Sequence, residues 1–155
     1  MKTIGKEGMP LEVLLIEDNP GDVRLTRETL CSGKRSIHLH VATDGVEAME
    51  FLFLRQKEGQ VRAPRPDLIL LDLNLPRMDG HEVMAQIKGD DSLKTIPTII
   101  LTTSDAKADI AESYQLHANC YLTKPVQLDA FNCLVKSTSD FWLSTVTLPP
   151  PSQPR

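Results

Sequence analysis

Three carboxylates in this chain directly follow short apolar runs that are typical of buried strands. Glu17 and Asp18 follow residues 13–16 (VLLI), and Asp72 follows residues 68–71 (LILL). Because the carboxyl ends of parallel strands meet at one edge of a sheet, we expect these acids to lie close together. Like charges in a poorly solvated crevice are costly unless a cation relieves them, and Mg²⁺ suits a partly hydrated site with one or two carboxylates. The pattern therefore predicts a magnesium site.

Two further polar residues stand at the ends of two other apolar runs. Thr102 follows residues 98–101 (TIIL), and Lys124 follows residues 119–122 (NCYL) after one intervening residue. A carboxylate can attack phosphorus as a nucleophile and form an acyl phosphate. Phosphoryl transfer then needs a metal, a cation and a hydroxyl donor around the equatorial oxygens. Asp72 as the acceptor, a bound Mg²⁺, Lys124 and Thr102 would supply one of each.

Stretches of helical periodicity alternate with these apolar runs along the chain. We expect strands near residues 13–16, 37–41, 68–71, 98–101 and 119–122. We expect helices near residues 20–31, 46–53, 80–89, 106–116 and 128–143, and a polar loop at residues 58–66. Five strands alternating with five helices predict an α/β domain, in which a parallel sheet is covered by helices on both faces.

The composition is that of a single globular domain. The 155 residues include 17 Lys and Arg against 21 Asp and Glu, and the net charge of −4 argues against unaided binding to nucleic acid or anionic lipid. No apolar run approaches the ~20 residues that cross a bilayer, and the N-terminus has no secretory signal. The 3 cysteines form no CxxC pair, which argues against a zinc or redox motif. We expect a cytoplasmic protein with an N-terminal extension (1–10), one domain (11–146) and a disordered proline-rich tail (147–155).

Four short motifs in the chain resemble the landmarks of a known family. They are residues 17–20 (EDNP), 71–80 (LDLNLPRMDG), 101–104 (LTTS) and 121–125 (YLTKP). Their order and spacing are similar to those of the receiver domain of two-component response regulators, and the resemblance covers about residues 11–143. It implies a single flavodoxin-like fold with a five-stranded parallel sheet, strand order 2-1-3-4-5 and five helices.

The resemblance also implies a role for each acidic residue of the site. Asp72 would be the phosphoacceptor, taking a phosphoryl group from the phosphohistidine of a sensor histidine kinase. Asp18, Asp72 and the backbone carbonyl of Asn74 would bind Mg²⁺, and Glu17 would act largely through bound water.

The remaining site residues receive their roles from the same resemblance. Lys124 would pair with Asp72 and then with the phosphoryl oxygens. Thr102 would swing toward the phosphate, and Tyr121 would turn inward with it as the second switch residue. The peptide bond between Lys124 and Pro125 would be cis.

Three segments, residues 66–76, 116–124 and 141–149, are similar to the small response regulators that partner cyanobacterial phytochromes. This resemblance implies that the upstream partner is a light-sensing phytochrome kinase. The signal would leave by contact with another protein or by onward phosphotransfer, because the chain carries no recognisable output module.

Several of these residues also have purely structural explanations. Asp18 and Asp72 each precede a turn where an aspartate caps a helix, and Thr102 suits a helix start. Tyr121 could serve only to pack the core. These explanations are weaker for the whole set than for any one residue.

Three consecutive apolar residues, Phe141, Trp142 and Leu143, lie at the end of the last predicted helix. One helix face cannot bury all three, and an exposed apolar patch usually marks an interface. We expect a homodimer through this helix together with the fourth helix and fifth strand. The alternative is that residues 146–149 fold back and cover the patch within one chain.

Other classes of function fit the sequence less well. A phosphohydrolase with an aspartyl nucleophile usually has a second acid two residues later, where this chain has Asn74. No GxxxxGK[ST] or GxGxxG motif is present, which argues against a nucleotide-binding protein. We therefore expect no enzyme beyond the chemistry at Asp72 itself, with a phosphorylation-independent scaffold receiver as the alternative.

Overall fold

The computed structural model describes residues 9–53, 56–57, 60–61 and 63–150. The strands are β1 (Leu11–Ile16), β2 (Ile37–Ala42), β3 (Gln56–Lys57), β4 (Gln60–Val61), β5 (Leu68–Leu71), β6 (Thr98–Thr102) and β7 (Cys120–Thr123). The helices are α1 (Pro20–Cys31), α2 (Gly45–Phe53), α3 (Gly80–Gly89), α4 (Lys107–Gln115), α5 (Leu128–Ser139) and the π-helix η1 (Asp140–Thr145).

The main sheet has five parallel strands in the order β2-β1-β5-β6-β7. Counted along the chain within this sheet, that order is 2-1-3-4-5, which confirms the expected topology and fold class. Ile16 pairs with Leu71, and Thr102 pairs with Thr123. The residues that follow these pairs are therefore brought together at the carboxyl edge of the sheet.

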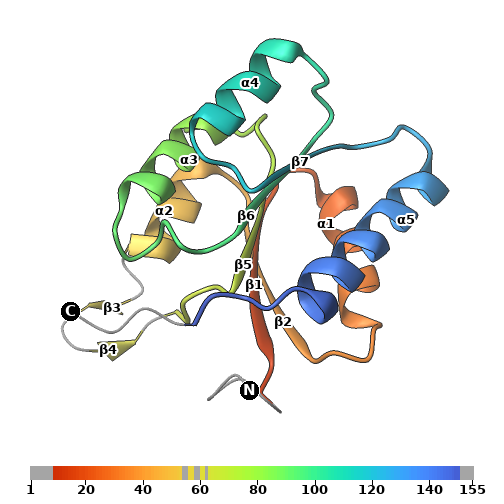
Figure 1. The fold of residues 1–155 in the computed structure, drawn as a ribbon, viewed down its shortest axis with the longest axis horizontal. Helices are drawn as coiled ribbons and strands as arrows, with labels where there is room; N and C mark the ends of the chain where they lie inside the picture. Colours follow the sequence, from red (N-terminus) through yellow and green to blue (C-terminus); the bar gives the residue numbers. More distant parts are fainter. Residues whose placement is uncertain (1–8, 54–55, 58–59, 62, 151–155) are drawn as a thin grey trace.

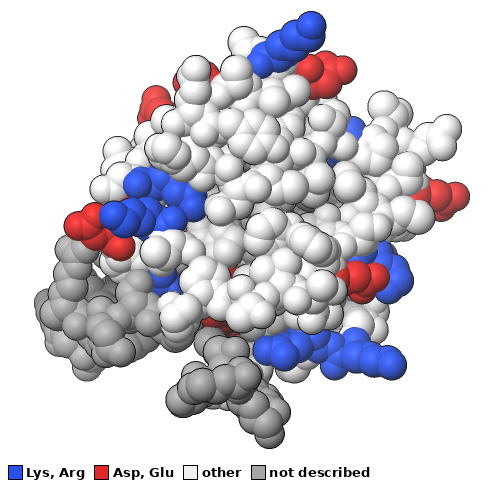
Figure 2. All heavy atoms as spheres, viewed as in Figure 1, with Lys and Arg blue, Asp and Glu red and all other residues white. Residues whose placement is uncertain are grey.

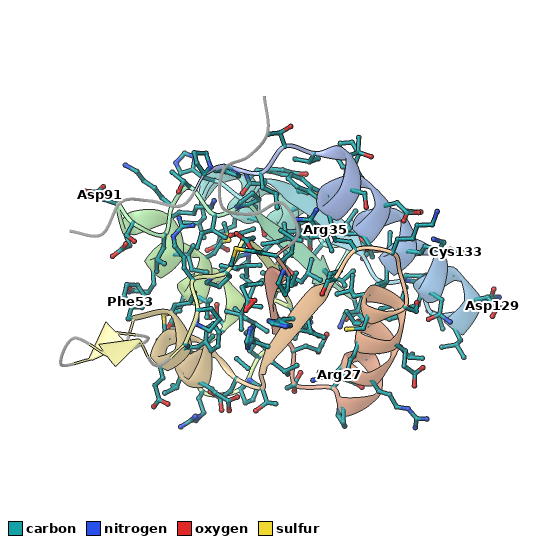
Figure 3. The ribbon with its side chains drawn as sticks, turned by 90° about the horizontal axis from the view of Figure 1, so that it is seen from below. Arg27, Arg35, Phe53, Asp91, Asp129 and Cys133 are labelled. Atoms are coloured by element: carbon teal, nitrogen blue, oxygen red, sulfur yellow. The ribbon has the colours of Figure 1, made fainter. Side chains whose placement is uncertain are left out.

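Helices cover both faces of the sheet and enclose two hydrophobic clusters. Figure 1 shows α1 and α5 on one side and α2, α3 and α4 on the other, and Figure 3 shows the same two layers from below. Alternate residues of β1 serve the two layers, because successive side chains of a strand point to opposite faces. Leu14 and Ile16 belong to the cluster under α2 and α3, whereas Val13 and Leu15 belong to the cluster under α1 and α5.

The structure departs from the predicted elements in two places. In the expected polar loop, β4 pairs as a short antiparallel strand with β3, which lies just before that loop. The last predicted helix ends at Ser139 and continues as the π-helix η1, in which Val146 N donates to Phe141 O at 2.8 Å. The wider turn changes which side chains face inward.

This change of helix geometry corrects part of the expected interface. Leu143 is buried in the core and is not available to a partner, and Trp142 packs partly against the same cluster. Leu148, in the segment expected to be disordered, packs there as well. Phe141 remains exposed, at 55%. Leu148 therefore folds back onto the core, as the alternative interpretation expects, while Phe141 stays uncovered.

The outer parts of the expected N-terminal extension and tail, residues 1–8 and 151–155, lie outside the described residues. Within the described part of the chain, no helix is both long and apolar enough to cross a membrane.

Candidate functional site

Three predicted acids converge at the carboxyl edge of the sheet. Glu17 and Asp72 directly follow the paired strand ends of β1 and β5, and both are buried, whereas Asp18 is exposed. One carboxylate oxygen from each of the three lies within 4.8 Å of the others. The structure thus assembles the acidic cluster that the strand-end pattern predicts.

Lys124 lies at the centre of this cluster. Its Nζ donates to Glu17 Oε1, to Asp72 Oδ2 at 3.1 Å and to Asp22 Oδ2 at 2.9 Å. Its backbone N–H donates to Thr102 O at 2.6 Å, which fixes the lysine at the end of β7 beside β6. The lysine side chain is only 4% exposed, so these ion pairs are shielded from water.

Asp22 is a site residue that the sequence analysis missed. It lies in the first turn of α1, and its N–H donates to Oδ1 of the helix cap Asn19 at 3.0 Å. Asn19 N in turn donates to Glu17 Oε2 at 3.2 Å, and Pro20 starts the helix, where its missing N–H costs nothing. An acid in the first turn of a helix that leaves the same sheet edge was the available signal for Asp22.

Burial and charge shift the pKa values in this cluster. Burial raises the pKa of Glu17 to about 7, and the Asp72 carboxylate adds to the rise while the hydrogen bond from Lys124 opposes it. Burial lowers the pKa of Lys124, but its bonds to Glu17 and Asp22 outweigh this effect and hold that pKa above its usual value. Lys124 therefore stays charged among acids that outnumber it. An all-oxygen donor set with excess negative charge fits a hard divalent cation such as Mg²⁺ or Mn²⁺.

The loop after β5 folds back onto Asp72. Asn74 N donates to Asp72 Oδ1 at 3.1 Å, which orients the carboxylate. Asp79 caps α3 by accepting from His81 N at 2.8 Å. A Cβ on Gly80 would lie 2.6 Å from Asp72 O, so glycine is required for this close approach.

Thr102, the predicted hydroxyl donor, lies at the same edge on the side of α4. It is fully buried, and no hydrogen-bond partner for its Oγ1 occurs among the described residues. A buried hydroxyl without a partner is uncommon and points to a group that it could bind.

Tyr121 lies beside the loop that links β6 to α4. Its hydroxyl donates to Ser104 O at 2.9 Å, and burial raises its pKa. Ser104 Oγ in turn donates to Asp109 Oδ2 at 2.5 Å, in the first turn of α4. The ring of Tyr121 is partly buried against the hydrophobic cluster under α2 and α3, as the structural explanation expects. Its hydroxyl is at the same time bound to this loop.

One expectation for this region is wrong. No peptide bond among the described residues is cis, so the bond between Lys124 and Pro125 is trans. For X–Pro bonds the trans form is lower in free energy by about 0.5–1 kcal/mol.

Comparison with known proteins agrees with this geometry. A family model described as the response regulator receiver domain matches residues 13–136. The chain belongs to this family. Response regulator Rcp1 of Synechocystis sp. (strain ATCC 27184 / PCC 6803 / Kazusa) is 48% identical to this receiver over 141 residues, 90% of this chain and 94% of that protein.

Two solved structures resemble this receiver equally well. The Mn²⁺-bound form of response regulator Rcp1 has a TM-score of 0.85 and 47% identity, covering 90% of this chain and 99% of that one. The phosphorylated cyanobacterial phytochrome response regulator RcpA gives the same four values. The receiver is therefore similar to one protein solved with a divalent metal and to one solved with a phosphoryl group.

Proposed function

We propose that this receiver accepts a phosphoryl group on Asp72 from a sensor histidine kinase, in a Mg²⁺-dependent reaction. The observation that carries the proposal is the setting of Asp72, a buried carboxylate within 3.1 Å of the Lys124 ammonium and within 4.8 Å of two further acids. A carboxylate oxygen of Asp72 forms the new P–O bond while the P–N bond of the donor phosphohistidine breaks and the imidazole leaves with its electron pair.

The other acids hold the metal in this proposal. Asp18, Asp72 and the backbone carbonyl of Asn74 bind Mg²⁺ directly, and Glu17 contributes through bound water. Mg²⁺ bound there supplies positive charge for the phosphoryl oxygens. Lys124 releases part of its hold on Asp72 and pairs with the new phosphoryl oxygens, a charge-assisted contact stronger than a neutral one.

Thr102 and Tyr121 transmit the change. The Thr102 hydroxyl, buried and without a partner among the described residues, donates to a phosphoryl oxygen once one is present. The phosphoryl group carries about two negative charges where the Asp72 carboxylate carried one, and it draws this hydroxyl and its loop inward. Because Tyr121 is bonded to Ser104 on the same loop, the movement reaches α4.

For the upstream partner we infer a phytochrome histidine kinase, because RcpA is described as a phytochrome response regulator and is 47% identical to this receiver. The receiver acts in the cytoplasm and passes its signal by protein contact or by onward phosphotransfer.

A homodimer through the last-helix region is part of the proposal. The face turned toward the viewer in Figure 2 carries α4, β7 and α5, and uncharged atoms cover most of its middle. Tyr114 on α4 and Phe141 in η1 are exposed, at 50% and 55%. Sedimentation of wild type and Phe141→Ser, with and without phosphorylation, tests this part. A wild type that stays monomeric at tens of micromolar in both states contradicts it.

The phosphoacceptor role is tested by incubating the full chain with Mg²⁺ and a small acyl phosphate, and then measuring intact mass. We expect one phosphoryl adduct on the wild type. No adduct should form when EDTA removes the Mg²⁺, or in the Asp72→Asn variant. The proposal fails if Asp72→Asn carries the same adduct. It also fails if wild type takes no phosphoryl group from either the acyl phosphate or a phosphorylated phytochrome kinase. Partner binding unaffected by Asp72→Asn would then favour the scaffold interpretation.

A further inference from the structure

An exposed arginine anchors the loop that carries Asn74. This loop, residues 73–79, runs from β5 to α3, and Arg77 lies near its middle. Arg77 Nε donates to Asp44 Oδ2 at 2.9 Å, and its Nη2 donates to Asp44 Oδ1 at 3.0 Å. This paired contact ties the loop to the start of α2 and has a fixed orientation, because the planar guanidinium matches the carboxylate.

Arg77 holds this contact in a strained backbone conformation. Its φ is 67°, in the left-handed region that residues with a side chain seldom adopt. Such strain persists only where surrounding contacts over-determine the conformation, and it clusters at functional sites. The Asp44 pair is one of those contacts.

The backbones of the loop and of α2 also interlock. A Cβ on Gly45 would lie 2.2 Å from Met78 O, so only glycine permits this approach. Gly45 N also donates to Pro76 O at 3.4 Å. Asp44 itself is well fixed, because its Oδ1 accepts from Glu47 N at 2.8 Å in the first turn of α2.

The other end of the same loop lies against the reactive carboxylate. Asn74 N donates to Asp72 Oδ1, and Gly80 N donates to Leu73 O at 2.9 Å. Asn74 is therefore held between two fixed points, the Asp72 carboxylate on one side and the Arg77 ion pair three residues later. A change at Arg77 therefore acts on the main chain of Asn74, which lies three residues away in the same loop.

We propose that Arg77 is a positioning residue, whose ion pair with Asp44 holds the strained loop so that the main chain of Asn74 lies in place for the metal bound at Asp72. This inference rests on the proposed function, because it assigns a support to that metal site. Arg77 touches neither the metal nor the phosphoryl group, and acts only through Asn74.

The test compares wild type with Arg77→Ala, Asp44→Asn and the double variant. Asparagine at position 44 keeps the oxygen that caps α2 and removes the charge that Arg77 binds. Lys94→Ala is the control, because it removes a cation from the exposed Asp91 pair at the amino edge of the sheet. Mn²⁺ affinity is measured by titration, and hydrogen exchange at residues 73–80 is followed without metal.

We expect each single variant to weaken Mn²⁺ binding by about tenfold, as loss of an outer-sphere support commonly does, and to speed exchange at residues 73–80. The double variant should be no more than about twofold weaker than either single, because both remove the same pair. Arg77→Gly separates strain from pairing. It relieves the positive φ and should not lower the urea unfolding midpoint, yet it should still weaken Mn²⁺ binding.

Unchanged Mn²⁺ affinity in Arg77→Ala and Arg77→Gly, beside a wild type that binds the metal, would overturn the role of Arg77 and leave the proposed function standing. Equal weakening in Lys94→Ala would also overturn it, because the effect would then be one of net charge. A wild type that binds no Mn²⁺ would overturn the metal site itself, and this role with it.

Discussion

The two halves of the site differ in how their polar groups are held. The acidic half comprises Glu17, Asp18, Asp22, Asp72 and Lys124, and the hydroxyl half comprises Thr102, Ser104 and Tyr121 with α4. In the acidic half one ammonium bridges carboxylates from two strand ends and a helix. In the hydroxyl half a buried threonine oxygen has no partner among the described residues. In our proposal the acidic half is pre-formed, and the hydroxyl half makes its bond when the phosphoryl group is present.

The helices beside the two halves differ in the same direction. Phe131 and Val135 bury apolar side chains from α5. Among the 9 residues of α4, all described, the one buried side chain is the polar Ser113. His81 on α3 lies 3.2 Å from Ser113 Oγ through Nε2 and 3.2 Å from Glu112 through Nδ1. Polar contacts can exchange for water at a smaller cost than apolar burial can be lost, so we expect α4 to respond more readily than α5.

The largest expected effect comes from breaking the acidic half. Lys124→Met leaves buried carboxylates without their cation and should lower the free energy of unfolding by about 3–5 kcal/mol. Urea unfolding at pH 7 measures this, and Mg²⁺ should restore part of the loss. Lys136→Met, which breaks an exposed pair with Asp140, is the control and should change stability by less than about 0.5 kcal/mol. Equal stability of Lys124→Met and wild type would contradict the bridging role of Lys124.

The pH dependence of stability tests the acidic half more finely. Without metal, folded Glu17 keeps its proton up to about pH 7, against an ordinary pKa of 4.5. Its contribution to stability is therefore fully present below pH 4.5 and is lost as the pH rises through 7, by at most about 1.4 kcal/mol per pH unit. Glu17→Gln should flatten this slope, as seen in urea unfolding from pH 5 to 8. An unchanged slope in Glu17→Gln would contradict the raised pKa of Glu17 in the folded protein.

Mg²⁺ affinity should show the opposite trend, because the cation competes with the proton. The affinity should fall as the pH is lowered from 8 to 6, and less steeply in Glu17→Gln than in wild type.

Thr102→Val tests the hydroxyl half of the site. It removes a hydroxyl that makes no bond to a described residue. The free energy of unfolding of the unphosphorylated protein should therefore change by less than about 0.5 kcal/mol or increase. Thr98→Val is the matched control on the same strand. Thr98 Oγ1 donates to Ile96 O at 3.1 Å, so its loss should cost about 1 kcal/mol. Equal losses in the two variants would show that Thr102 has a structural bond.

Tyr121→Phe tests the bond that the hydroxyl half already makes, because it deletes the bond to Ser104 O and keeps the ring. We expect a loss of about 1 kcal/mol or less in thermal or chemical unfolding. Tyr114→Phe, at an exposed tyrosine on α4, should leave stability unchanged. If Tyr121→Phe is equally silent, the hydroxyl does not hold the loop of the hydroxyl half.

Strand-end chemistry could be predicted from the sequence because it depends on one-dimensional patterns. Apolar runs that stop at Glu17, Asp72 and Thr102 mark strand ends, and parallel pairing brings such ends to one edge. The same logic placed Lys124 at the edge. It could not show that Lys124 contacts Asp22, since that contact depends on the packing of α1 beside the sheet.

Contacts that depend on three-dimensional packing were out of reach of the sequence. The ion pair of Arg77 with Asp44 joins two loops. The positive φ of Arg77 could not be predicted either, because an arginine in the sequence does not indicate such a backbone conformation. The inward position of Leu143 depends on a π-helix, whose wider turn defeats the usual period of 3.6 residues. Two-residue strands such as β3 and β4 are likewise too short for alternation to reveal.

Hydrogen exchange of the receiver before and after phosphorylation at Asp72 tests the division between the two halves most directly. We expect exchange to change at residues 103–116 and around Tyr121, while residues 17–31 keep their protection. The result that would contradict this division is a change confined to residues 17–31, or an equal change in both segments.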